Sequence, residues 1–263
     1  MSLLWKIKQP NATDESYIFG TMHLQPNANS DWTTTLLPFL EKCAVFATEF
    51  DLADADPTLL AQYSRLPDRQ QLSDFIALKK LVKLEGILFK STGLRLTHFS
   101  TLKPLFITNL LTEKILADDH SIAMDRILYQ MAMDLNKDCT GIETFAEQLA
   151  ILNKIPLEDQ VKSLLKIGKN IGRFRKNLQK MLAVYQRGDV QAIHRMARKG
   201  TGKLRKLMLY QRNELMSNRI FKKIEEKAIF CAIGAGHLGG KRGVLRLLKH
   251  KGLIVQPVPF QLS

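Results

Sequence analysis

Two histidines stand at the ends of apolar runs near opposite ends of the chain. The run 17–22 leads into a Gly-x-x-His motif that ends at His23, and the run 228–233 leads into a second that ends at His237. Glycine permits close backbone approach, and a neutral imidazole can ligate a metal or accept a proton near neutral pH. A lone histidine is more simply explained as a buried side chain with backbone partners. Because the context occurs twice, we expect His23 and His237 to share one site.

Carboxylates stand at the ends of two further apolar runs. Glu49 and Asp51 close the run 45–50, and Glu143 follows the run 138–142. In an open parallel sheet, ligands bind beyond the carboxyl ends of the strands. Residues two apart on a strand share a face, so Glu49 and Asp51 can point the same way. The alternatives are a solvated acid at a strand end and, for Glu143, a helix N-terminal acid favoured by the helix dipole.

The elements that must position these side chains form an α/β pattern. Short apolar runs bounded by Gly, Pro, Asn or Asp predict strands at 3–8, 17–22, 45–50, 138–142, 228–233 and 253–258. Periodicity predicts helices at 31–42, 102–117, 121–136 and 241–250. Strand–helix–strand order near both ends predicts a central, mostly parallel sheet built from two βαβ-type halves and covered on both faces.

The rest of the chain is predicted to be helical. The stretches 57–136 and 144–227 carry almost no strand signal. We therefore expect a single domain over residues 1–263 with helical insertions at about these two places. Segment 162–227 contains 19 Lys or Arg and 4 Asp or Glu, whereas the whole chain has a net charge of +14. We expect this segment to form a cap over the site.

The concentrated positive charge predicts an anionic partner, although solvated helix faces explain most charged helices. An acidic substrate, a nucleic acid and an anionic membrane surface remain open. Nucleic acid is less favoured, because exposed aromatics for base stacking are not interleaved with the basic residues. No apolar run is long enough to span a membrane, and no secretory signal begins the chain, so we expect a cytoplasmic protein.

Several common chemistries lack their motifs. Cys43, Cys139 and Cys231 have no metal-like spacing, which predicts buried free thiols. Residues 234–239 satisfy G-x-G-x-x-G, but no acidic residue follows them to bind a ribose, so a dinucleotide site is weakly supported. No Gly-x-Ser-x-Gly, His-Glu-x-x-His or Walker motif is present. The other four histidines are expected at the surface: His98, His120, His194 and His250.

Landmarks along nearly the whole chain resemble the TraB/GumN family, which includes the PrgY and Tiki proteins. They are Leu4-Trp5-Lys6-Ile7, Gly20-Thr21-Met22-His23, Thr48-Glu49-Phe50-Asp51, Gly141-Ile142-Glu143-Thr144 with Gln148, Arg187-Gly188-Asp189, Arg212-Asn213, and Gly234-Ala235-Gly236-His237-Leu238-Gly239-Gly240 with Gly243-Val244-Leu245. The resemblance implies an α/β core of two related halves, similar to haem-binding ChaN-like proteins and erythromycin esterases. Phe50 departs from the smaller aliphatic residue that is common in the family. Many bacterial relatives are exported, whereas this sequence shows no signal peptide.

The family also implies a chemistry, since Tiki members are described as proteases that use manganese or cobalt. Carried over, His23, Glu49 and His237 would be metal ligands, with Arg212, Asn213 and Glu143 supporting them. We therefore expect a hydrolase of peptides or other acyl substrates, most simply a peptidase dependent on Mn, Co or Zn. Glu143 or Asp51 would act as general base, and Arg212 would hold a substrate carboxylate or the developing oxyanion.

Two alternatives to this metal-dependent hydrolase remain open. One is a metal-free hydrolase with His23 as general base. The other is a non-catalytic protein that binds or sequesters a peptide, haem or an anion. The oligomeric state does not follow from the sequence.

Overall fold

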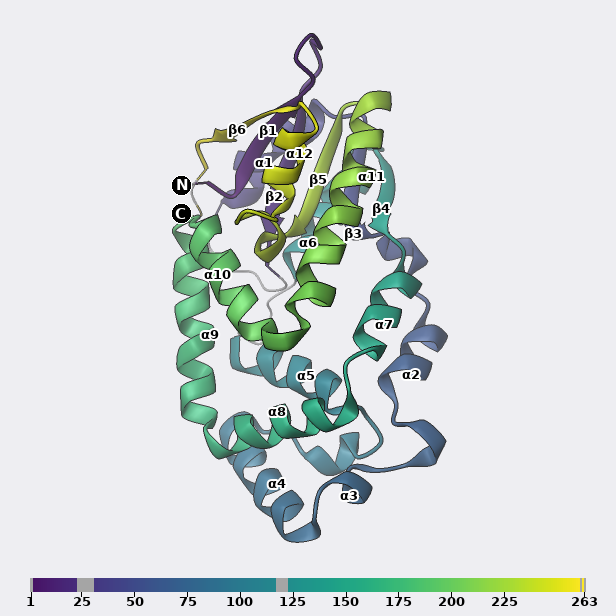
Figure 1. Cartoon of the computed structure of the whole chain (residues 1–263), viewed down its shortest axis with the longest axis vertical. Coiled ribbons are helices and arrows are strands. Elements are labelled where there is room, and N and C mark those ends of the chain that lie inside the picture. The colour runs from purple at the N-terminus through teal and green to yellow at the C-terminus, as the bar shows by residue number, and fades with distance from the viewer. Residues whose placement is uncertain (1, 23–30, 117–122, 261, 263) are drawn as a thin grey trace. The chain divides into compact units, whose positions relative to one another are not determined.

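The chain forms two compact units (Figure 1). The computed structural model describes residues 2–22, 31–116, 123–260 and 262. Unit 1 comprises Met1–Ala55, Ser121–Glu147 and Met181–Ser263, and unit 2 comprises Asp56–His120 and Gln148–Lys180. The expectation of one domain with two helical insertions stays a prediction.

Unit 1 contains, within its described residues, a six-stranded sheet in the order β4-β3-β5-β2-β1-β6. The strands are β1 (Leu4–Lys8), β2 (Ser16–Thr21), β3 (Val45–Phe50), β4 (Asp138–Glu143), β5 (Ile229–Gly234) and β6 (Ile254–Val258). Strands β2, β5, β3 and β4 pair in parallel, whereas β1 runs antiparallel to both β2 and β6. The six predicted strands are confirmed, and a mixed sheet of mainly parallel strands positions the site.

The central strands are covered on both faces. Every residue of β2 is buried, and so are the first five residues of β5, although successive side chains point to opposite faces of a sheet. Helix α11 (Arg212–Glu226) contacts β4 and β5, α12 (Val244–His250) contacts β6, and α6 (Met124–Asp134) contacts β3 and β4. In Figure 1, α11 and α12 pass in front of the sheet.

The other helices of unit 1 complete its core. They are α1 (Trp32–Glu41), α10 (Val190–Thr201) and the last part of α9 (Ile171–Gln186). A π-helix, η5 (Lys206–Gln211), leads directly into α11. Short π segments are rare and often lie near functional sites. Here the π-helix immediately precedes Arg212 and Asn213, the first two residues of α11.

Unit 2 is helical in its described residues, apart from one isolated bridge between Arg65 and Leu102. Its helices are α2 (Pro57–Ser64), α3 (Leu72–Phe75), α4 (Leu78–Thr92), α5 (Pro104–Leu116) and α8 (Leu157–Lys169), with most of α7 (Phe145–Asn153) and the first part of α9. A separate apolar cluster that includes Leu84, Leu88 and Leu164 holds them together. None of the described helices is both long and apolar enough to cross a membrane.

Candidate functional site

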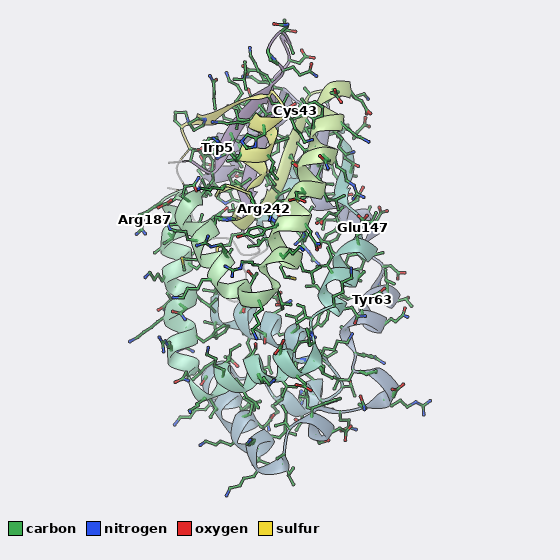
Figure 2. The ribbon with its side chains drawn as sticks, in the orientation of Figure 1. Trp5, Cys43, Tyr63, Glu147, Arg187 and Arg242 are labelled. Atoms are coloured by element: carbon green, nitrogen blue, oxygen red, sulfur yellow. The ribbon has the colours of Figure 1, made fainter. Side chains whose placement is uncertain are left out.

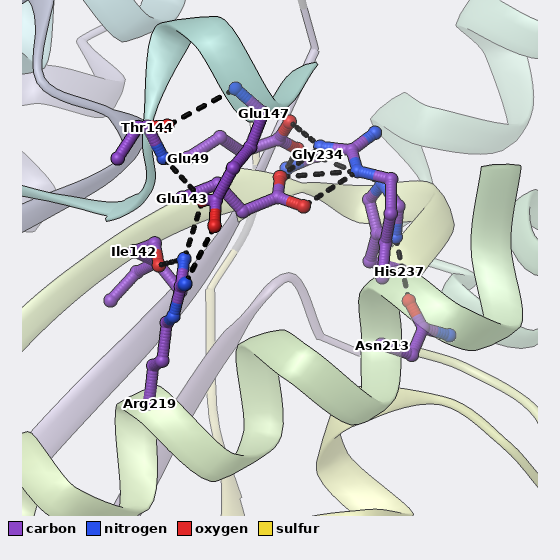
Figure 3. Close-up of polar contacts among 10 residues, drawn as sticks. Glu49, Ile142, Glu143, Thr144, Glu147, Asn213, Arg219, Gly234 and His237 are labelled. Carbon is purple, nitrogen blue, oxygen red and sulfur yellow. Dashed lines mark hydrogen bonds and ion pairs between the residues drawn. The ribbon is translucent and has the colours of Figure 1, made fainter. Parts of the chain in front are cut away.

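The carboxyl ends of β3, β4 and β5 meet at one edge of the sheet, because these strands are parallel neighbours. Glu49 is the penultimate residue of β3, Glu143 is the last residue of β4, and Gly234 is the last residue of β5. His237 follows in a short 3₁₀ helix, η6 (Ala235–His237). Figure 3 shows the labelled Glu49, Glu143 and His237 side chains in one polar cluster with Asn213 of α11.

Arg212 holds the two carboxylates of this cluster. Its Nε donates to Glu143 Oε1 at 3.0 Å and to Oε2 at 3.1 Å, and its Nη2 donates to Glu49 Oε2 at 2.7 Å and to Glu143 Oε2. The Glu143 side chain is fully buried, and 12% of the Arg212 side chain is exposed. Burial by itself would lower the pKa of Arg212, but the Glu49 and Glu143 carboxylates outweigh it and raise that pKa. Arg212 is therefore a fixed cation.

The second oxygen of Glu49 is held by the backbone. Glu49 Oε1 accepts a hydrogen bond of 2.8 Å from the Gly234 N–H group. A Cβ atom on Gly234 would lie only 2.9 Å from that oxygen, so the absence of a side chain permits the contact. Arg212 and Gly234 together fix the orientation of Glu49.

Asn213 fixes the orientation of His237. Asn213 Nδ2 donates to the carbonyl oxygen of Arg242 at 2.7 Å, which leaves Asn213 Oδ1 facing His237 Nδ1 at 2.6 Å. An amide oxygen only accepts, so Nδ1 of His237 carries a hydrogen. Asn213 and His237 are both buried. Arg242, labelled in Figure 2, precedes α12 and pairs with Glu214 of α11.

This network aims Nε2 of His237 at Glu49. His237 Nε2 lies 3.8 Å from Glu49 Oε1. When the imidazole is neutral and Nδ1 carries its hydrogen, Nε2 is an acceptor, and it faces an acceptor oxygen. Such a pair is stable when a proton or a cation is shared between the two atoms. The arrangement can therefore hold a proton, or supply two ligands to a metal ion.

A second ion pair braces the neighbouring turn between β4 and α7. Arg219 of α11 makes two parallel hydrogen bonds to Glu147, of 2.7 and 2.8 Å, and a third of 2.9 Å to the carbonyl oxygen of Ile142. Glu147 also accepts from the N–H group of Thr144. Hydrogen bonds from Arg219 lower the pKa of Glu147 to about 2, despite partial burial. This pair was not predicted from the sequence, although Glu147 stands in the first turn of α7.

The structure thus brings together five of the predicted site residues, namely Glu49, Glu143, Arg212, Asn213 and His237. Asp51 has other partners, because its Oδ1 accepts from the Ala53 N–H group and from the Tyr129 hydroxyl. His23 lies outside the described residues. The catalytic and metal-binding roles given to these residues stay predictions.

The expectation that His194 is a surface residue is wrong. It is buried, and its Nδ1 lies 2.9 Å from the carbonyl oxygen of Gly236 in the turn that carries His237. Gln191, one turn earlier on α10, accepts from the Gly240 N–H group. The i,i+4 spacing of Val190 and His194 on the apolar face of α10 could have revealed this burial. His98 and His250 are exposed as expected, and His120 lies outside the described residues.

The three cysteines are free thiols. Cys43 and Cys231 are buried, and Cys139 is partly buried. Burial raises the pKa of Cys43 to about 12 and also raises those of Cys139 and Cys231. Since the thiolate is the nucleophile, none of the three is activated.

The described residues fit part of a metal site. Glu49 and His237 offer a carboxylate oxygen and an imidazole nitrogen, and Asn213 binds the other ring nitrogen, as outer partners of metal-bound histidines do. No group of three or more His, Cys, Asp or Glu residues among the described ranges could hold a metal ion. The third predicted ligand, His23, is not among those residues.

Comparison with known proteins identifies the family. A sequence model of the TraB/PrgY/gumN family matches residues 3–257, so the chain belongs to this family. No solved structure matches the chain significantly.

The chain is similar over nearly its whole length to curated metalloproteases. It is 24% identical to "Metalloprotease TIKI2" of Danio rerio, with 99% of this chain and 61% of the relative covered. It is 23% identical to "Metalloprotease TIKI1" of Danio rerio and 24% identical to that of Homo sapiens, with 98% of this chain and 63% and 62% of the relatives covered. The chain therefore spans about three fifths of the length of these relatives.

Proposed function

We propose that this member of the TraB/PrgY/gumN family is a hydrolase, most simply a peptidase that depends on a divalent metal. Its distant relatives are named metalloproteases, which supports this class of activity. The observation that carries the proposal is the pair Glu49 and His237, held 3.8 Å apart with the ring oriented by Asn213. The substrate would be a peptide or another acyl compound.

His23, Glu49 and His237 would hold the ion, which would be Mn, Co or Zn. When bound, the ion supplies Lewis-acid polarisation of a scissile carbonyl and of water. The chain's own residues prepare the site for it. Gly234 and Arg212 hold Glu49, and Asn213 leaves His237 Nε2 directed toward the Glu49 carboxylate.

Arg212 and Glu143 act as a unit in this proposal. Both oxygens of Glu143 are engaged by Arg212, so the geometry supports a positioning role for Glu143 rather than proton transfer. Nη1 of Arg212 makes no hydrogen bond to the described part of the chain, and it remains able to donate to a substrate carboxylate or to an oxyanion. The base roles predicted for Asp51 and Glu143 stay predictions.

The second candidate is a metal-free hydrolase. It rests on the Glu49–His237 pair itself, in which Nε2 of an oriented imidazole lies 3.8 Å from a carboxylate oxygen. A carboxylate against an oriented histidine can hold and transfer a proton without a metal. The predicted base, His23, lies outside the described residues, so His237 is the histidine whose geometry supports this alternative.

Metal content and turnover, measured together, test the proposal. We expect protein purified without chelators to carry a divalent metal that Glu49→Gln and His237→Ala each remove, with loss of turnover on a peptide library. His250→Ala, at an exposed histidine, is the matched control and should keep both. Metal-free wild type with turnover would establish the metal-free candidate. Bound metal without turnover on any peptide would favour the non-catalytic binding protein.

The finer fold assignment also belongs to this proposal. We infer that the core consists of two related halves, as in ChaN-like proteins and erythromycin esterases, and that the part of segment 162–227 that belongs to unit 1 forms a cap. Support comes from the mixed sheet with β3, β4 and β5 ending at one edge, and from Arg212 and Asn213 pointing into the polar cluster.

A further inference from the structure

Helix α4 of unit 2 exposes a row of apolar side chains. Leu78, Val82 and Phe89 are 71%, 64% and 44% exposed. Their spacing of four and seven residues places them on one face of the helix. They make up three of the five large hydrophobic residues that are exposed in the described part of the chain. We call them the apolar row.

A row of lysines runs beside the apolar row. Lys79, Lys83 and Lys90 each follow one member of the apolar row, so they repeat its spacing about 100° further around the helix. All three are exposed. Gly86 lies between the two rows, and a Cβ atom there would meet nothing within 4 Å, so the surface between them is open. Arg95 adds a cation over the Phe89 ring at 4.3 Å.

The opposite face of α4 is already used. Leu84 and Leu88 are buried in the apolar cluster of unit 2, and α4 packs closely enough on α8 that a side chain at Gly168 would collide with Leu84. The helix is therefore folded and anchored before it meets anything at its outer face. Phe89 is partly covered and has Arg95 over its ring, whereas Leu78 and Val82 are mostly exposed, and the exposure of these two residues needs another explanation.

We propose that the outer face of α4, which carries the apolar row and the row of lysines, docks on the surface of an anionic lipid bilayer. A row of apolar side chains beside a row of lysines is the pattern of helices that lie in the membrane interface, where the apolar side chains enter the acyl boundary and the lysines meet anionic headgroups. Charge complementarity selects this occupant over a second copy of the chain, because pairing two α4 faces would bring two lysine rows together.

An acidic protein partner fits the outer face less well. Three apolar side chains on a convex helix offer a small contact, whereas a stable protein interface buries about 800 Å² on each partner. A lipid surface is deformable and needs no complementary groove. The contact is therefore expected to be peripheral and reversible, and to weaken as salt screens the lysines.

Sedimentation with lipid vesicles tests the proposal. We expect the wild-type chain to bind phosphatidylcholine vesicles that contain phosphatidylserine, and to leave pure phosphatidylcholine vesicles unbound. Replacing Lys79, Lys83 and Lys90 by Glu should weaken binding by about tenfold or more. The charge-matched control replaces Lys166, Lys176 and Lys180, exposed on α8 and α9, by Glu and should lose much less.

The apolar row has its own matched pair of variants. Leu78→Ser with Val82→Ser should weaken vesicle binding several-fold, whereas Leu60→Ser with Met133→Ser, at exposed residues elsewhere, should not. Circular dichroism checks that each variant is folded. Failure of the wild type to bind anionic vesicles would overturn the proposal, and so would equal loss in the two lysine variants. A wild-type dimer that Leu78→Ser with Val82→Ser converts to a monomer would instead assign this face to a second copy.

Discussion

Asn213 determines which nitrogen of His237 carries the hydrogen. We expect Asn213→Ala to cost about 1–3 kcal/mol of unfolding free energy, because the buried Nδ1–H group and the Arg242 carbonyl lose their partners. The ring should also lose its fixed tautomer. Chemical denaturation measures the first effect, and ¹⁵N NMR of the imidazole measures the second. Asn218→Ala, at an exposed asparagine on the same helix, is the control.

Asn213→Asp separates the two functions of the amide. An aspartate can still accept from Nδ1 but cannot donate to the Arg242 carbonyl, so the tautomer should survive while part of the stability is lost. A wild-type spectrum in which neutral His237 carries its hydrogen on Nε2 would contradict the orientation inferred from the hydrogen bonds.

Arg212 compensates two carboxylates, so its loss should be the most damaging single change in the cluster. Arg212→Met would leave Glu49 and Glu143 facing each other without their cation, and we expect it to cost about 3–5 kcal/mol. Glu143→Gln added to Arg212→Met removes one of the stranded charges and should recover part of that loss. A double-mutant cycle by denaturant unfolding measures the coupling. Additive losses would show that the two residues do not interact.

At the scale of elements, the Glu147–Arg219 pair ties the start of α7 to α11. The pKa of Glu147 is lowered to about 2 from 4.5, chiefly by hydrogen bonds from Arg219. The folded-state pKa lies below the unfolded value, so this carboxylate adds stability above about pH 4.5. That contribution is lost as the pH falls toward 2. The pair is about one third exposed, so solvent screening keeps the effect small.

Glu147→Gln tests this pH dependence. We expect it to destabilise the protein at neutral pH, and the difference from the wild type to shrink between pH 4.5 and 2. Denaturant unfolding at several pH values measures the difference, with Glu158→Gln, at an exposed carboxylate on α8, as the control. A difference that stays constant with pH would show that Glu147 acts by packing alone.

The strands were the elements that sequence predicted best. Runs such as 45–50 and 228–233 are short, apolar and bounded by turn residues, so local pattern alone locates them. The antiparallel direction of β1 could not be predicted from the hydrophobic pattern of the sequence, because it depends on which strands β1 pairs with. The π-helix before Arg212 was not predicted from the sequence either.

The candidate site was predictable where a residue ends a strand. Glu49, Glu143 and His237 were visible in this way, and their meeting follows from parallel pairing of β3, β4 and β5. Arg212 and Asn213 came from family resemblance, because nothing in their own segment marks them. The burial of His194 was missed, although its i,i+4 spacing from Val190 places it on the apolar face of α10.

At the scale of the whole molecule, the basic segment is not one structural unit. Residues 162–227 are divided between unit 2 and unit 1 within α9. The charge excess therefore belongs to both units, although it is continuous in sequence. A partner attracted by this charge can meet either unit, and the three control lysines of the vesicle test, on α8 and α9, all lie in unit 2.

The two units also have separate apolar cores. Phe19, Phe46 and Phe230 belong to the core of unit 1, whereas Leu88 and Leu111 belong to the core of unit 2. Each core is formed by side chains of its own unit, so the units have the means to open separately. A substitution that creates a cavity in one core should therefore act first on the amides of that unit.

Leu88→Ala tests whether the two units open separately. The leucine is fully buried, so its truncation should cost about 2–5 kcal/mol. We expect amides of α4, α5 and α8 to exchange hydrogen faster, while amides of β2 and β5 keep their wild-type protection. Hydrogen exchange with mass spectrometry measures both sets in one sample. Ile220→Ala, in the core of unit 1, should give the reverse pattern. Equal acceleration in both units by either substitution would mean that the chain unfolds as a single cooperative body, because a cavity in one core would then lower the stability of all amides alike.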